Sequence, residues 1–111
     1  CALPAQFELM YAFDALIGNE GRSQDRLLYD AKEWNLLLTG HDRAFSTKRE
    51  FPAHLQQRAP QPGAELRKRL AGLDEAGLQT TLGDLVGKRE IKTLLQRRDA
   101  VLSGAAAAAA R

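Results

Sequence analysis

The spacing of apolar residues predicts a helix near the beginning of the chain. Over residues 5–18, apolar side chains recur at helical spacing, with Pro4 near the start and Gly18 near the end. The members of this stripe are Phe7, Met10, Tyr11, Ala12, Phe13, Leu16 and Ile17. Methionine and aromatic residues in such a stripe usually belong to a protein core, so we expect this helix to pack inward.

The next segment has the pattern of a β-hairpin. In "RLLYDAKEWNLLLTG", two short apolar runs flank the polar "DAKE", which predicts strands at about 26–30 and 34–39. We expect Trp34 to belong to the hairpin core and Gly40 to end the second strand. Residues 41–62 lack clean periodicity and are rich in proline, so we predict an extended loop with one short helical turn near 52–58.

The last third of the chain is predicted to be helical. Leu66, Leu70 and Leu73 share one face of a helix that follows Pro62, and Asp74 has the character of an N-cap for the next helix. A final helix follows, with apolar residues at 91, 94, 95, 101 and 102. The predicted fold class is α+β and mainly helical, and the single hairpin must lie against helices because a lone hairpin is only marginally stable.

Composition indicates one ordinary domain. The chain has 111 residues, 44% hydrophobic and 27% charged, which is enough for one compact core. A net charge of +2 with interleaved acids and bases is too mild to indicate nucleic acid as a partner. No apolar run approaches the ~20 residues that span a bilayer, so we expect no membrane span and favour a soluble, cytoplasmic protein.

The two ends of the chain give separate expectations. The lone cysteine, Cys1, excludes an internal disulfide. Its position suits either the processed end of a bacterial lipoprotein or a chain that begins in mid-sequence, and we favour the second. We therefore assign residues 1–103 to one domain of a larger protein and no function to the Ala-rich residues 104–111.

Residues 16–30, "LIGNEGRSQDRLLYD", have the rhythm of a catalytic loop and are followed by the predicted hairpin and "TGHDRAF". This arrangement resembles the C-terminal lobe of the kinase-like superfamily, in particular its HipA-type, phosphatidylinositol-kinase-like and secretory-pathway branch. Bacterial members of that branch read roughly "LI-N-x-D-R-x-x-x-N-L-L-x-D" and then "I-D-H-x-R-A-F". The residues that match are Leu16, Ile17, Asn19, Arg22, Leu27, Leu28 and Asp30, and then His41, Arg43, Ala44 and Phe45.

The resemblance implies an active site whose chemistry is missing here. In kinases the loop supplies an Asp that takes the substrate's proton, an Asn five positions later that binds metal, and a further Asp after the hairpin that binds Mg²⁺. This chain has Gly21, Arg26 and Gly40 at those positions. Loss of all three removes the base and both protein ligands for the metal, and each 1.4 kcal/mol or so of lost transition-state stabilisation slows a reaction about tenfold.

Several neighbouring residues have roles that the resemblance suggests. Asp25 and Asp42 are fallback metal ligands, if a one-residue slip brings a carboxylate near a vacated position. Arg26 has two readings that stay open: its guanidinium replaces Mg²⁺ and contacts a phosphate or carboxylate, or it is a solvated arginine at the start of a strand. The residues we expect to bind ligand or to hold the loop are Asn19, Arg22, Arg26, His41, Asp42 and Arg43.

The structural expectations for these side chains differ. Asn19 and Arg22 should brace the loop through hydrogen bonds or an ion pair, and His41 should pack and hydrogen-bond beside it. Arg43 and Phe45 should anchor the segment after the hairpin. We expect His54 to be solvated and without a partner.

Three functional hypotheses follow. The leading one is a pseudokinase lobe without cofactor or metal, acting as a scaffold that binds a protein partner or a missing N-terminal lobe. The second is an active kinase with displaced metal ligands, which would use ATP and Mg²⁺. The third is a small helical adaptor whose resemblance to kinases is coincidental.

Overall fold

The computed structural model describes residues 3–56 and 58–104. The predictions for Cys1 and for the alanines from 105 onward lie outside the described residues. The elements, in chain order, are α1 (Leu3–Ile17), η1 (Gln24–Arg26), β1 (Leu27–Asp30), β2 (Asn35–Leu38), η2 (Ala53–Leu55), α2 (Ala64–Ala71), α3 (Glu75–Leu82) and α4 (Lys88–Ser103). This is the predicted mainly helical α+β arrangement.

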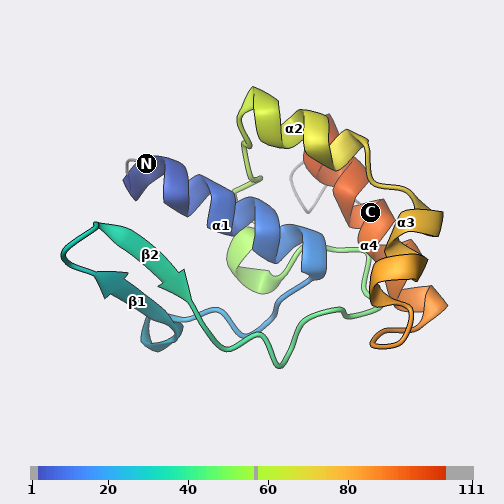
Figure 1. Cartoon of the computed structure of the whole chain (residues 1–111), viewed down its shortest axis with the longest axis horizontal. Helices are drawn as coiled ribbons and strands as arrows, with labels where there is room; N and C mark the ends of the chain where they lie inside the picture. The colour runs from blue at the N-terminus through green and yellow to red at the C-terminus, as the bar shows by residue number, and fades with distance from the viewer. Residues whose placement is uncertain (1–2, 57, 105–111) are drawn as a thin grey trace.

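Helix α1 lies at the centre of the molecule. It packs against α4 on one side and against β2 on the other, so the hairpin and the C-terminal helices cover opposite flanks of one helix (Figure 1). The helix begins two residues earlier than predicted and ends at Ile17. Gly18 follows with φ +64°, the left-handed conformation that glycine adopts without a steric penalty when it ends a helix.

The predicted apolar stripe of α1 is correct in part. Met10, Ala12 and Ile17 are buried, but Phe13 is 41% exposed, and Asp14, which is not part of the predicted stripe, is completely buried. A carboxylate within the buried face is unusual because an unpaired buried charge is costly, so Asp14 requires partners.

The hairpin forms where the sequence predicts it, with strands slightly shorter than expected. Antiparallel pairing runs from Leu27↔Leu38 to Asp30↔Asn35. Gln6 of α1 connects the hairpin to the helix, because its side chain donates to the Trp34 carbonyl at 2.9 Å and accepts from the Leu36 amide at 2.6 Å.

The prediction that Trp34 belongs to the hairpin core is wrong. Trp34 has φ 54° at the end of the turn, and it is 64% exposed. Apolar character alone could not place it, because the backbone of the turn, which Gln6 holds through the Trp34 carbonyl, turns the indole toward solvent.

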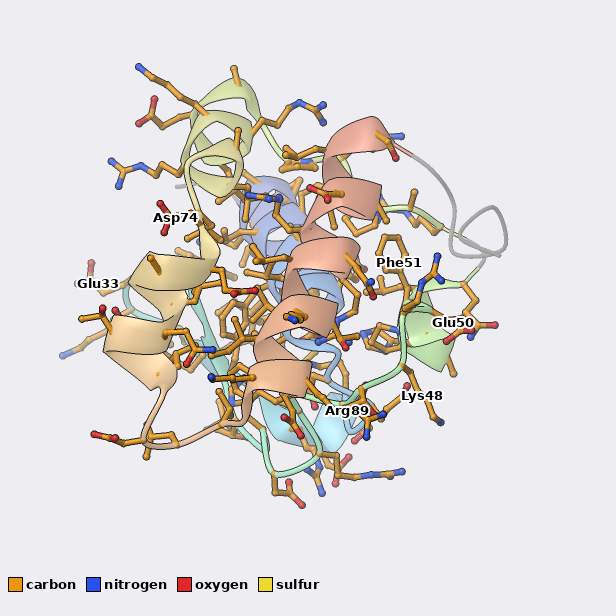
Figure 2. All side chains as sticks on the ribbon, turned by 90° about the vertical axis from the view of Figure 1, so that its right-hand side faces the viewer. Glu33, Lys48, Glu50, Phe51, Asp74 and Arg89 are labelled. Carbon is orange, nitrogen blue, oxygen red and sulfur yellow. The ribbon has the colours of Figure 1, made fainter. Side chains whose placement is uncertain are left out.

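The segment after the hairpin is irregular, as predicted, and it contributes to the core. Its one helical turn is η2, inside the predicted range 52–58. Phe51 and Leu55 are each 1% exposed and pack in one cluster with Ala15, Leu70 and Val101. Figure 2 shows Phe51 beside α4, whereas Lys48 and Glu50 point away from that helix.

The C-terminal helices also form as predicted. The Asp74 side chain caps α3 by accepting from the Gly77 amide at 2.7 Å. Leu70 is buried on α2, with Leu66 and Leu73 packed beside it against the core. No helix within residues 3–56 and 58–104 is long and apolar enough to cross a membrane.

Candidate functional site

The loop that resembles a catalytic loop begins where α1 ends. Gly18 turns the chain, and the buried Asn19 then hydrogen-bonds back to the helix: its backbone N–H donates to the Asp14 carbonyl at 3.0 Å. Its side-chain amide donates to Asp14 Oδ1 at 3.2 Å, while its Oδ1 accepts from the Gly21 amide at 3.1 Å. Asn19 therefore fixes the loop to the helix, and the bracing contacts predicted for it are present.

The side-chain partners of the buried Asp14 come from two segments, the loop after α1 and η2. Arg22 donates from Nε to Oδ2 at 2.8 Å and from Nη2 to Oδ1 at 3.0 Å, which is a bidentate ion pair. His54 Nε2 lies 3.3 Å from Oδ2. Burial by itself raises the pKa of Asp14, but the hydrogen bonds from His54, Arg22 and Asn19 outweigh it and hold that pKa below its ordinary value.

The expectation that His54 is solvated and without a partner is wrong. Its side chain is 25% exposed and contacts the Asp14 carboxylate. The physical reason is long-range: η2 folds back onto α1, so residues forty positions apart meet. Sequence spacing carries no signal for such a contact.

Arg22 also joins the two residues that flank the hairpin, Arg26 just before β1 and Thr39 just after β2. Its Nη1 donates to the Arg26 carbonyl at 3.1 Å and to the Thr39 carbonyl at 3.0 Å. Its Nη2 lies 3.2 Å from His41 Nε2, and the His41 ring stands edge-on to Phe13 with the centroids 5.8 Å apart. The predicted bracing contacts of Arg22 and the packing of His41 are both present.

Arg26 lies in the space between Gly21 and Gly40. Its Nη1 donates to the Gly40 carbonyl at 3.0 Å and to Asp42 Oδ1 at 2.7 Å. A Cβ atom placed on Gly40 would lie 2.5 Å from Arg26 Cδ, and one placed on Gly21 would lie 3.1 Å from Arg26 Nη1. Positions 21, 26 and 40 are thus adjacent, and the Arg26 guanidinium occupies the space among them.

The two fallback carboxylates both have partners within the protein. Asp42 pairs with Arg26, and this hydrogen bond lowers the pKa of Asp42. Asp25 accepts a hydrogen bond from the Ser23 hydroxyl, which lowers the pKa of Asp25. Both carboxylates are exposed, so water solvates their charge and a bound cation is not required.

Arg43 approaches the same place from the segment after the hairpin. Its Cδ would lie 3.6 Å from a Cβ atom on Gly21. Its carbonyl accepts from the Glu20 amide at 3.3 Å, and the nearby Phe45 amide donates to the Ile17 carbonyl at 2.5 Å. Arg43 and Phe45 therefore anchor this segment, as predicted, but they do so through their backbones.

Sequence reasoning missed Arg97, the largest fully buried side chain. It donates to the carbonyls of Leu16 at 3.1 Å, Ser46 at 3.0 Å and Lys48 at 2.6 Å, and so joins α4 to both ends of the candidate site. Burial lowers the pKa of Arg97 to about 10. The sequence pattern did indicate that position 97 is buried, because it lies on the apolar stripe of α4, three residues after the buried Leu94.

An apolar groove of about 260 Å³ opens beside the site, between α1 and β2. The groove is lined by Gln6, Leu9, Met10, Phe13, Leu36 and Leu38. Phe13 belongs both to this groove and to the contact with His41, so the groove and the loop share a wall.

A magnesium ion of the kinase type does not fit these residues. Glycine at 21 and 40 offers no side-chain oxygen, and the Arg26 cation fills the space where a metal ligand would be required. Comparison with protein-family models, with curated proteins and with solved structures found no match to this chain.

Proposed function

We propose that the chain is a kinase-like C-terminal lobe that has lost metal-dependent phosphoryl transfer and acts as an interaction module. The observation that carries this proposal is the position of Arg26. Its guanidinium forms hydrogen bonds with Gly40 and Asp42 and lies 3.1 Å from the point where a side chain on Gly21 would begin. A built-in cation in that place opposes the binding of a divalent one.

The contacts among Asp14, Asn19 and Arg22 agree with this proposal. Phosphoryl transfer depends on positioned charge, with a metal ion that bridges the phosphate oxygens. In this chain the bracing contacts of Asn19 and Arg22 to Asp14 hold the loop and hairpin in place independently of any metal ligand. A loop held in this way supports binding without turnover.

The proposed partner surface includes the groove beside the loop. Its walls are mainly apolar, and further apolar side chains are exposed on the hairpin, including Leu28 at 52% and Leu37 at 49%. Apolar exposure of this kind is typical of surfaces that bind protein. The partner is either another protein or an N-terminal lobe.

The test compares the unaltered chain with the triple variant Gly21→Asp, Arg26→Asn, Gly40→Asp. Calorimetric titration uses Mn²⁺ alone and ATP with either Mg²⁺ or EDTA. We expect the unaltered chain to show no saturable Mn²⁺ binding and no gain in ATP affinity from Mg²⁺, whereas the triple variant should bind Mn²⁺ because it regains oxygen ligands.

Folding of the triple variant is checked by thermal denaturation. Arg26 has to be replaced together with Gly40, because a side chain on Gly40 would collide with it. Gly40 also has φ +73°, so the aspartate there is strained in any case and the melting temperature of the triple variant should fall. Tighter ATP binding by the unaltered chain in Mg²⁺ than in EDTA, by about tenfold or 1.4 kcal/mol, would contradict the proposal and favour an active kinase with displaced ligands.

A further inference from the structure

Two arginines from different segments converge above Gly21. Arg26 comes from the start of the hairpin and Arg43 from the segment after it. Gly21 has no side chain, and a Cβ atom there would lie 3.1 Å from Arg26 Nη1 and 3.6 Å from both Arg43 Cδ and Asn19 Oδ1. The two side chains therefore flank one small space at the surface.

Both guanidinium groups keep donors that no protein atom uses. Within residues 3–56 and 58–104, Arg26 donates only through Nη1, and its Nε and Nη2 have no hydrogen-bond partner. In the same part of the chain the Arg43 side chain has neither a hydrogen bond nor an ion pair. By contrast, all three nitrogens of Arg22 have partners.

The nearby carboxylates do not neutralise this pair. Asp14 is hydrogen-bonded to Arg22 and His54, and Asp42 accepts a hydrogen bond from only one nitrogen of Arg26. Glu20 is the residue next to Gly21, but its Oε2 accepts a long hydrogen bond of 3.5 Å from the Ala53 amide in η2. Within the described residues, the one ion pair of these two guanidinium groups is that of Arg26 with the exposed Asp42.

We propose that Arg26 and Arg43 form a phosphate-binding site above Gly21 that needs no metal ion. Guanidinium groups donate pairs of parallel hydrogen bonds that match the oxygens of phosphate. Two such groups approaching from separate segments suit a phosphate group, because it offers oxygens in several directions whereas a carboxylate offers two in one plane. The inference rests on the proposed function, since a divalent cation would compete for the same space.

The experiment is a calorimetric titration of the full chain with inorganic phosphate and with pyrophosphate, both in EDTA. Four variants accompany the unaltered protein: Arg26→Met, Arg43→Met, Gly21→Ala and the control Arg69→Met. Arg69 is exposed on α2 and pairs only with Glu65 in the neighbouring turn, so its replacement removes the same charge away from the site.

We expect Arg26→Met and Arg43→Met each to weaken binding about tenfold or more, because each removes charge-assisted hydrogen bonds to the phosphate oxygens. Gly21→Ala should weaken binding while keeping every charge, since its methyl group enters the space between the arginines. Gly21 does not have a positive φ, so this variant should fold, and thermal denaturation checks that it does. Arg69→Met should bind as the unaltered chain does.

Two outcomes would overturn the inference. Equal weakening by Arg26→Met, Arg43→Met and Arg69→Met would mean general attraction of anions to a basic protein. Absence of phosphate and pyrophosphate binding by the unaltered chain would also overturn it, yet would leave the proposed function in place. Binding of ATP that requires Mg²⁺ would instead remove the proposed function, so the two failures are distinguishable.

Discussion

Arg22 and Arg26 lie four residues apart in the same loop, and they have opposite environments. The Arg22 side chain is 4% exposed and forms a bidentate pair with a fully buried carboxylate. The Arg26 side chain is 32% exposed, and its acidic partner Asp42 is 70% exposed. One arginine belongs to the interior, while the other is partly exposed at the surface.

The difference separates the frame of the site from its centre. The frame of Asp14, Asn19 and Arg22 fixes the loop to α1 and to the two residues that flank the hairpin. The centre is made of Gly21, Arg26 and Gly40, and no contact of the frame depends on a metal ion there. The residues that hold the loop are therefore not those at its centre, so the contacts that fix the loop do not involve the side chains at positions 21, 26 and 40.

Replacement of Arg22 should have the largest effect. Arg22→Met leaves the buried Asp14 without its main partner, and breaking a buried ion pair costs about 3–5 kcal/mol of unfolding free energy. Arg26→Met is the matched control, since exposed ion pairs contribute about 0–1 kcal/mol. Urea denaturation measures both. Equal losses for the two variants would contradict the distinction between frame and centre.

Lowering the pH should have the second largest effect on stability, because it protonates Asp14 of the frame. The pKa of Asp14 is lower in the folded protein than in the unfolded chain, so its stabilising contribution is present above the unfolded pKa of about 3.8 and is lost as pH falls through the folded value. We expect unfolding free energy to fall below about pH 4, with the ¹³C carboxyl signal of Asp14 titrating below that point. Titration of Asp14 at or above 3.8 would show that burial outweighs its hydrogen bonds.

The elements of the fold were largely readable from the sequence because their signals are local. Helical spacing located α1 and α4, alternating apolar runs located the hairpin, and a single residue, Asp74, marked the start of α3 through its hydrogen bond to the next turn. Each of these signals acts between residues a few positions apart. The loop between the hairpin and α2 was also recognised, although its share of the core was not.

The site was readable only in part, because its contacts are distant in the chain. The pairing of His54 with Asp14 and of Arg97 with the Leu16 carbonyl joins residues 40 and 81 positions apart. Local patterns carry no information about such pairs. The prediction for Trp34 was wrong for another reason. Its apolar character indicated burial, but the conformation of its backbone in the turn directs the side chain toward solvent.

The central claim is that the Arg26 side chain holds the place of a cation, and reversing its charge tests this most directly. Arg26→Glu would set a carboxylate beside Asp42 and the Gly40 carbonyl, which together offer the oxygen ligands of a divalent-cation site. The measurement is the melting temperature of both proteins in MnCl₂ and in EDTA. We expect the unaltered chain to melt at the same temperature in both, and Arg26→Glu to melt about 4–8 °C higher in MnCl₂ for each 1 kcal/mol or so of binding energy. Stabilisation of the unaltered chain by Mn²⁺, with none for Arg26→Glu, would contradict the account.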